Sequence, residues 1–238
     1  MRLPQIFVLP LALALALGGC VMPGPAPAVA PVAVAPAQPP RAAAETFLSV
    51  IARVEPVAES YCRARAVAMH CDFRIVVDDR PGQPPNAFQT LDRNGRPVIG
   101  FTLALIADAR NADELAFVLG HEAAHHISGH IPKRQDQALS GAILAGVLAQ
   151  ASGLSPDEIR AAQNIGAEVA ARSYSREFEL EADALGAEIA FRAGYDPVRG
   201  SGFFDRLPDP GDKFLGSHPP NAQRKAQVAA TVRRLQGL

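Results

Sequence analysis

Two histidines and one glutamate in the run 121–125 have the residue types and spacing of a metal site. On a helix, His121 and His125 share one face with Cβ atoms about 5–6 Å apart, so both imidazoles can reach one tetrahedral zinc ion. Glu122 is one residue round the helix, where it can take a proton from zinc-bound water without binding the metal. The run therefore predicts hydrolysis by metal-activated water, if a third ligand is present.

Candidates for the third ligand lie further along, in a segment with helical periodicity over residues 175–183. Glu179 and Asp183 are four residues apart and share a face. Glu179 is therefore the predicted ligand, and Asp183 is predicted to accept a hydrogen bond from a ligand imidazole and orient it. Glu181 lies about 200° round the helix from Glu179, so we interpret it, with Glu177, as a solvated charge.

Two further histidines follow the motif closely, at positions 126 and 130. Gly129 and His130 each stand one position away from the His-x-x-Gly-x-x-His spacing that would supply a third histidine ligand. We therefore interpret His126 and His130 as residues beside the site or on the surface, and not as ligands.

The elements that must position these residues are mostly helical. Asn111 and Glu114 form a capping-box pattern and predict the start of the helix that carries His121. A single long helix is predicted over residues 156–193, closed by Gly194. A new element is predicted to open at Asp196-Pro197.

The remaining patterns predict one more long helix and a small sheet. Residues 43–68 have helical spacing, with Pro56 expected to kink or split the helix. Residues 73–77 and 97–103 are predicted strands, and the segment 136–151 is predicted to be a buried or groove-lining helix, too short and glycine-rich for a membrane span. The predicted fold class is α+β, mostly helical, with a small β-sheet beside the metal-binding helix.

The N-terminus has the pattern of a bacterial lipoprotein. Residues 1–19 are predicted to be a signal peptide, and Leu17-Gly18-Gly19-Cys20 is similar to a lipobox in which Cys20 is lipidated. The alternative is an ordinary signal peptide with a chance cysteine. Residues 20–42 are rich in Pro and Ala and predict an extended linker, which leaves residues 43–238 as the folded domain.

Composition and cysteine content agree with an envelope protein. A formal net charge of −1 and a pI of about 6.6 give no reason to expect a nucleic-acid partner. Apart from Cys20 there are only Cys62 and Cys71, an even pair in an oxidising compartment. A disulfide between them is predicted, with two buried free thiols as the alternative.

The runs 121–125, 175–183 and 193–197 together resemble the gluzincin metallopeptidases that include the CAAX prenyl proteases and the HtpX-like and BepA-like proteases. Further matching residues are Asn86-Ala87-Phe88, Asp113-Glu114-Leu115-Ala116, Ser217-His218-Pro219-Pro220 and Arg224, so the resemblance covers roughly residues 70 to 230. It implies a zincin-type domain with one zinc ion per chain, Glu179 as the third ligand, and protein or peptide substrates.

The resemblance also implies details of the site and its location. His218 is expected near the metal, where it would either stabilise the oxyanion or cap the zinc. The strand at residues 98–103 would pair with an extended substrate. Transmembrane helices and C-terminal repeats of the larger relatives are not expected, so the chain is most similar to small single-domain periplasmic lipoproteins. Val21 after Cys20 favours the outer membrane, facing the periplasm.

The sequence therefore predicts a zinc endopeptidase of the bacterial cell envelope that acts on misfolded or misassembled envelope proteins and is tethered by an N-terminal lipid. A non-catalytic, zinc-stabilised lipoprotein that serves as an assembly factor is the alternative. A hydrolase of cell-wall peptides is a third interpretation. Glu122 argues against the assembly factor, because a purely structural zinc site needs no general base.

Overall fold

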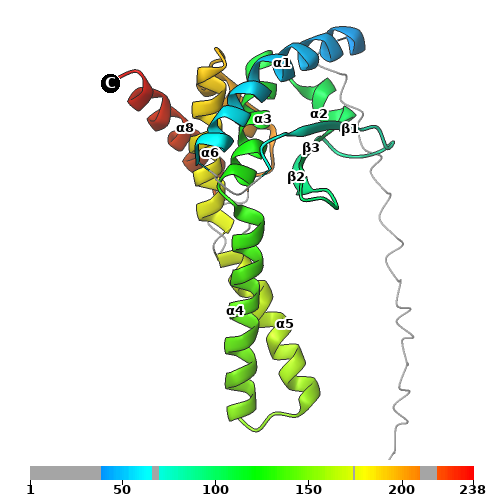
Figure 1. Ribbon diagram of the computed structural model, residues 1–238, viewed down its shortest axis with the longest axis vertical. Coiled ribbons are helices and arrows are strands. Elements are labelled where there is room, and N and C mark those ends of the chain that lie inside the picture. The colour runs from blue at the N-terminus through cyan, green and yellow to red at the C-terminus, as the bar shows by residue number, and fades with distance from the viewer. Residues whose placement is uncertain (1–38, 66–69, 174, 210–218) are drawn as a thin grey trace, which may run out of the picture. The chain divides into compact units, whose positions relative to one another are not determined.

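The computed structural model describes residues 39–65, 70–173, 175–209 and 219–238. Within these ranges the chain is mostly helical with one three-stranded sheet (Figure 1), which confirms the predicted α+β class. The predictions for the signal peptide, Cys20, the linker up to residue 38 and His218 concern residues outside the described ranges.

Helix α3 (Ala112–Ile127) carries the H-E-x-x-H run and is buried along most of its length. The side chain of Asn111 caps it as predicted, since Oδ1 accepts a hydrogen bond from the N–H of Glu114 at 3.1 Å. The Glu114 carboxylate accepts from the N–H of Arg110 at 3.0 Å, one residue before the cap. The start of the motif helix is thus fixed by side chains on both sides of the cap.

Helix α1 (Pro40–Arg65) packs against α3 and contributes Phe47 to the core. It begins three residues before the expected domain start at Ala43. The prediction that Pro56 splits this helix is wrong, because Pro56 lies inside one continuous helix. Pro56 and Ala52 are both exposed, so the Ala52 carbonyl, which loses its helical partner, can be solvated by water.

The sheet contains β1 (Arg74–Asp78), β2 (Ala87–Leu91) and β3 (Pro97–Thr102) in the order β1-β3-β2. Strand β3 is parallel to β1 and antiparallel to β2, and it leads directly into α2 (Leu103–Asp108). The expectation that residues 98–103 pair with a substrate is wrong, because β3 already has a neighbour on both sides. The edge strand on the antiparallel side is β2.

The segment predicted as one helix over residues 156–193 forms two, α5 (Pro156–Ser173) and α6 (Ser175–Arg192). Their packing partners explain the division: α5 lies along α4 (His130–Ala151), whereas α6 packs against α3 and the C-terminal helix α8 (Asn221–Leu235). One straight helix cannot follow both sets of partners, and tertiary packing outweighs the continuous local periodicity.

The end of α6 and the elements after it follow the sequence prediction. Gly194 has a φ of 86°, the left-handed conformation of a residue that closes a helix. Asp196 then caps α7 (Pro197–Gly200), and the 3₁₀ helix η1 (Ser201–Arg206) follows.

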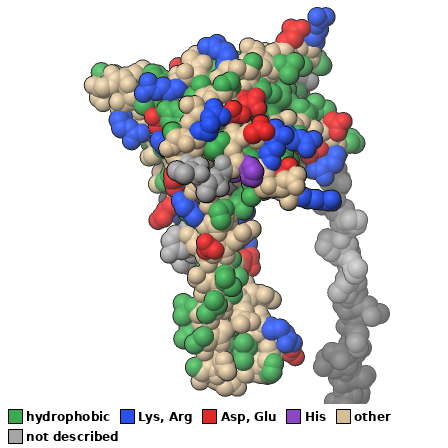
Figure 2. All heavy atoms as spheres, viewed as in Figure 1, with side chains coloured by type: hydrophobic (Ala, Val, Ile, Leu, Met, Phe, Trp, Pro, Cys, Tyr) green, Lys and Arg blue, Asp and Glu red, His purple; other side chains and the backbone are tan. Residues whose placement is uncertain are grey.

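Helices α4 and α5 run side by side and are joined by residues 152–155 (Figure 1). Helix α4 begins at His130, six residues before the predicted start at position 136. The expectation of a buried or groove-lining helix is wrong, since large aliphatic side chains of α4 are exposed (Figure 2). Among the described residues, no helix combines the length and the apolar character that crossing a bilayer requires.

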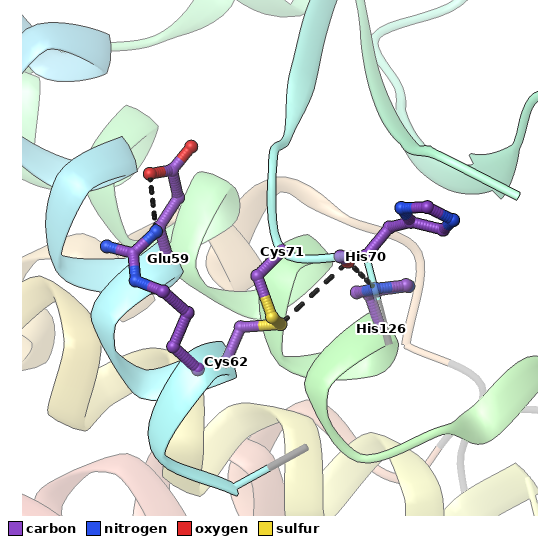
Figure 3. The surroundings of a disulfide bond; sticks show 6 residues. Glu59, Cys62, His70, Cys71 and His126 are labelled. Atoms are coloured by element: carbon purple, nitrogen blue, oxygen red, sulfur yellow. Dashed lines mark hydrogen bonds and ion pairs between the residues drawn. A yellow bond between two sulfur atoms is a disulfide. The ribbon is translucent and has the colours of Figure 1, made fainter. Parts of the chain in front are cut away.

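A disulfide joins Cys62 at the end of α1 to Cys71 before β1 (Figure 3). Their Cα atoms are 5.5 Å apart, within the range that a disulfide spans. Beside it, Nε2 of His126 on α3 donates a hydrogen bond to the His70 carbonyl at 2.7 Å. The bridge therefore holds the entry to the sheet against the helix that carries the metal-binding run.

Replacing both Cys62 and Cys71 with serine should lower the free energy of unfolding by about 2–3 kcal/mol, because the unfolded chain regains the entropy of a short closed loop. Urea unfolding of the full chain, with and without reductant, measures this. Reductant should destabilise the wild type by the same amount and leave the double variant unchanged. A wild type insensitive to complete reduction would contradict a stabilising role.

Candidate metal centre

Helices α3 and α6 approach each other closely at two glycines, and this contact brings the predicted ligands together. A Cβ atom on Gly120 would lie 2.6 Å from the carbonyl oxygen of Gly186, and one on Gly186 would lie 2.6 Å from the backbone nitrogen of His121. Only glycine fits at both positions without moving the backbones apart. The approach sets Glu179 and Asp183 of α6 opposite the histidines of α3.

The side chains of His121, His125 and Glu179 converge on one point. Nε2 of His121 lies 3.0 Å from Nε2 of His125 and 3.5 Å from Oε2 of Glu179. Nε2 of His125 lies 3.4 Å from the other oxygen of Glu179. His121 is buried, His125 is half-buried and the side chain of Glu179 is 12% exposed, so the group is reachable from a cavity but is not a surface cluster.

These separations fit a tetrahedral metal ion. Zinc–nitrogen and zinc–oxygen bonds of about 2.0–2.1 Å at tetrahedral angles place neighbouring ligand atoms about 3.3 Å apart. The three donor atoms lie within 4.8 Å of one another, and the two imidazoles and one carboxylate are ligands that zinc accepts. The residues present therefore fit a three-ligand site with an open fourth position.

Asp183 and Arg224 fix the orientation of His121. Oδ1 of Asp183 lies 3.0 Å from Nδ1 of His121, which leaves Nε2 of the ring directed at Glu179. Asp183 is fully buried, and Arg224 of α8 donates to its two oxygens, both at 2.7 Å. Burial lowers the pKa of His121, but hydrogen bonds to Asp183 and Glu179 outweigh it and raise this pKa to about 10. Carboxylates that favour a charged imidazole here also favour a bound cation.

A second chain of contacts orients His125. Its Nδ1 lies 2.8 Å from Nδ1 of His130, and Nε2 of His130 lies 3.2 Å from Oε2 of Glu181. Burial and the neighbouring His125 lower the pKa of His130 to about 4, so this imidazole is neutral at pH 7. A neutral His130 can accept from His125 and donate to Glu181, which leaves Nε2 of His125 free for a metal.

Glu122 lines a cavity of about 500 Å³ together with His121, His125 and Glu179. Burial raises the pKa of Glu122, and the nearby Glu179 adds to this, against the lowering effect of the two histidines. The edge strand β2 contributes Ala87 to the rim. Apolar side chains from α2, α3 and the region of η1 also line the cavity: Leu105, Phe117, Val118, Phe203, Phe204 and Leu207.

The structure brings together all the described residues that the sequence predicted for the metal site. Sequence reasoning missed the role of Glu181, which is half-exposed but contacts His130. It also gave Arg224 no role, although this residue was among the family matches. Nothing in the local periodicity could have paired Glu181 with a histidine 51 positions away or Arg224 with an aspartate 41 positions away.

Comparison with known proteins agrees with this site. The model of peptidase family M48 matches residues 46–232. A Vibrio cholerae protein named as a beta-barrel assembly-enhancing protease is 30% identical over 126 residues, 49% of this chain and 25% of that protein. The mitochondrial metalloendopeptidase OMA1 of Arabidopsis thaliana is 30% identical over 136 residues, 56% of this chain and 27% of that protein. The matched segments thus span about a quarter of each relative. Because the family match covers most of the sequence and includes the whole metal site, the chain belongs to peptidase family M48.

Proposed function

We propose that this chain is a zinc-dependent endopeptidase with His121, His125 and Glu179 as ligands. One observation carries the proposal: the three ligand atoms and the carboxylate of Glu122 open into the same cavity. A purely structural zinc site is usually closed by four protein ligands and needs no general base. Membership of a peptidase family and the printed names of the relatives support hydrolysis of peptide bonds.

In the proposed reaction Glu122 is the general base and later the general acid. A bound zinc ion supplies a Lewis acid that polarises the scissile carbonyl and lowers the pKa of water. Glu122 removes a proton from the attacking water and delivers it to the leaving amine nitrogen. The raised pKa of Glu122 suits both steps, because a group that titrates nearer to neutral pH gives up a proton more readily. Asp183 and His130 hold the two ligand imidazoles in their orientations.

The substrate is proposed to bind as an extended strand along β2, the sheet edge beside the cavity. The apolar side chains that line the cavity favour a large apolar side chain next to the cleaved bond. His218 remains a predicted oxyanion donor or zinc cap.

The proposed location is the cell envelope, with Cys20 lipidated in the outer membrane and the domain facing the periplasm. The run Leu17-Gly18-Gly19-Cys20 supports this, as does the Cys62–Cys71 disulfide, since such bonds persist in oxidising compartments. Misfolded or misassembled envelope proteins are then the proposed substrates, in line with the name of the Vibrio cholerae relative.

Removing the metal tests the proposal directly. Detergent-purified full chain should bind one zinc per molecule and cleave casein or unfolded envelope proteins, lose this activity with a chelator, and regain it when zinc is returned. Glu179→Ala should lose zinc and activity, whereas Glu177→Ala on the exposed part of α6 should keep both. Zinc-loaded wild type that cleaves none of these proteins would overturn the endopeptidase and favour the assembly factor. Activity on cell-wall peptides alone would favour the third interpretation.

A further inference from the structure

Helix α4 exposes a contiguous set of large aliphatic side chains along its middle turns. Each of them is between 56% and 62% exposed: Leu139, Ile143, Leu144, Val147 and Leu148. At 100° per residue they cover about 180° of the helix circumference. Single exposed aliphatic residues are common, but a contiguous set of this kind usually marks a contact surface.

Small residues, in contrast, fill the contact between α4 and α5. A Cβ atom on Gly141 would collide with the carbonyl oxygen of Gly166, and a Cβ on Gly166 would collide with that of Gly141. The same Cβ on Gly166 would lie 2.5 Å from the Cβ of Ala145. Small residues inside and large aliphatic residues outside are the reverse of a helix pair in water. This arrangement is typical of helix pairs in contact with lipid.

Charge is distributed unequally over this hairpin. Residues 137–156 contain no charged side chain, whereas α5 carries Asp157, Glu158, Arg160, Glu168 and Arg172. Figure 2 shows hydrophobic side chains gathered along the α4 edge of the hairpin and charged ones on the α5 edge. Ile165 and Val169 are exposed beside the charges of α5, so α5 is mixed and only the α4 side is purely aliphatic. An arrangement with one aliphatic side and one charge-bearing side suits a helix pair that lies on a bilayer rather than one that crosses it.

We propose that the α4/α5 hairpin docks on a phospholipid bilayer, with the aliphatic face of α4 in the interfacial region. The proposed bilayer is the one to which a lipidated Cys20 would attach the chain, so the identity of this membrane rests on the proposed lipid anchor. Twenty residues separate Cys20 from Pro40, and a Pro-rich segment of that length spans at most about 60 Å at about 3.1 Å per residue.

Docking also bears on the proposed catalytic site. Helix α4 starts at His130, which contacts the ligand His125, and Ile131 and Arg134 of its first turns line the cavity. The helix that meets the lipid is therefore the helix that borders the cavity. A docked hairpin would hold the cavity at a fixed orientation to the membrane surface, where envelope proteins are inserted.

Tryptophan fluorescence tests the docking without background, because the chain contains no tryptophan. Leu144→Trp places the probe on the aliphatic face, and Glu168→Trp places it on the charged side of α5. Both full chains are reconstituted into vesicles of phosphatidylethanolamine and phosphatidylglycerol, with or without bromine on the acyl chains. We expect the emission of Leu144→Trp to shift to shorter wavelength and to be quenched by the brominated lipid. Glu168→Trp should show neither effect.

Charge on the aliphatic face should undo the docking. Adding Leu139→Asp and Leu148→Asp to the Leu144→Trp chain should abolish the shift and the quenching, whereas Ala161→Asp with Asn164→Asp on exposed positions of α5 should not. Circular dichroism and casein cleavage check that each chain stays folded.

Equal quenching of both probes, or none of Leu144→Trp, overturns the proposal. So does a lipid-independent shift of Leu144→Trp that grows with protein concentration, which would assign the face to a second copy. The lipid anchor is judged separately, by whether the chain that carries Leu139→Asp and Leu148→Asp, which should not dock, still floats with the vesicles.

Discussion

Glu122→Gln is expected to lower kcat for peptide cleavage by about 10²–10⁴-fold while one zinc ion stays bound. The amide keeps the size of the side chain and its place in the cavity but cannot take a proton from water. His121, His125 and Glu179 are unchanged, so the affinity for zinc should change little. Cleavage of an unfolded envelope protein and the zinc content of the same sample measure the two quantities together.

The stability of the variant separates a chemical defect from an unfolded protein. Burial raises the pKa of Glu122, so the ionised carboxylate disfavours the folded state at pH 7. Glutamine carries no charge, and the zinc-free Glu122→Gln protein should therefore be at least as stable to urea as the wild type. Glu177→Gln, an exposed change of the same chemistry, should affect neither activity nor stability. Normal cleavage by zinc-loaded Glu122→Gln would exclude Glu122 as the base.

The residues that each helix contributes to the site could be predicted from local periodicity, whereas joining Glu179 to the two histidines also drew on the family resemblance, because a contact between α3 and α6 brings them together. His121 and His125 are one helical turn apart, as are Glu179 and Asp183, and each pair needs only a helix to share a face. The same is true of the Asn111 cap and of Gly194 at the end of α6, whose local chemistry survives in the fold. Helix caps, helix ends and residue pairs one turn apart depend only on residues close together in the chain, and they could therefore be predicted from the sequence.

Features that depend on packing between distant elements could not be predicted. The segment 156–193 has continuous helical periodicity, yet it divides because α5 and α6 have different partners. The segment 136–151 looked like a buried helix because it is apolar. In the structure α5 packs along one side of α4, and the large aliphatic side chains of α4 lie on the part of its surface that α5 leaves uncovered. Which face of an apolar helix is covered depends on the elements that pack against it, and the local composition of the helix does not predict those elements.

Arg224→Met is expected to lower the free energy of unfolding of the zinc-free protein by about 3–5 kcal/mol. Arg224 is buried and donates to both oxygens of Asp183, which is itself fully buried. Methionine keeps much of the packing against Phe204, over whose ring the guanidinium lies at 4.1 Å. It removes the guanidinium that contacts both Asp183 and Glu179, however, so that the single charge of His121 faces two carboxylates, and the uncompensated carboxylate charge is the main cost. Urea unfolding at pH 7 measures it.

The double variant Asp183→Asn/Arg224→Met distinguishes this cause from a loss of packing. If the cost is the uncompensated carboxylate, the double variant should be more stable than Arg224→Met alone; if it is packing, the two effects should add. Asp183→Asn alone should weaken zinc binding by about 10–100-fold, because Nδ1 of His121 loses the carboxylate that orients its ring. Asp205→Asn breaks only the surface ion pair with Lys225 and should leave zinc binding unchanged. Unaltered zinc binding in Asp183→Asn would mean that the close contact of α3 with α6 is enough to orient His121.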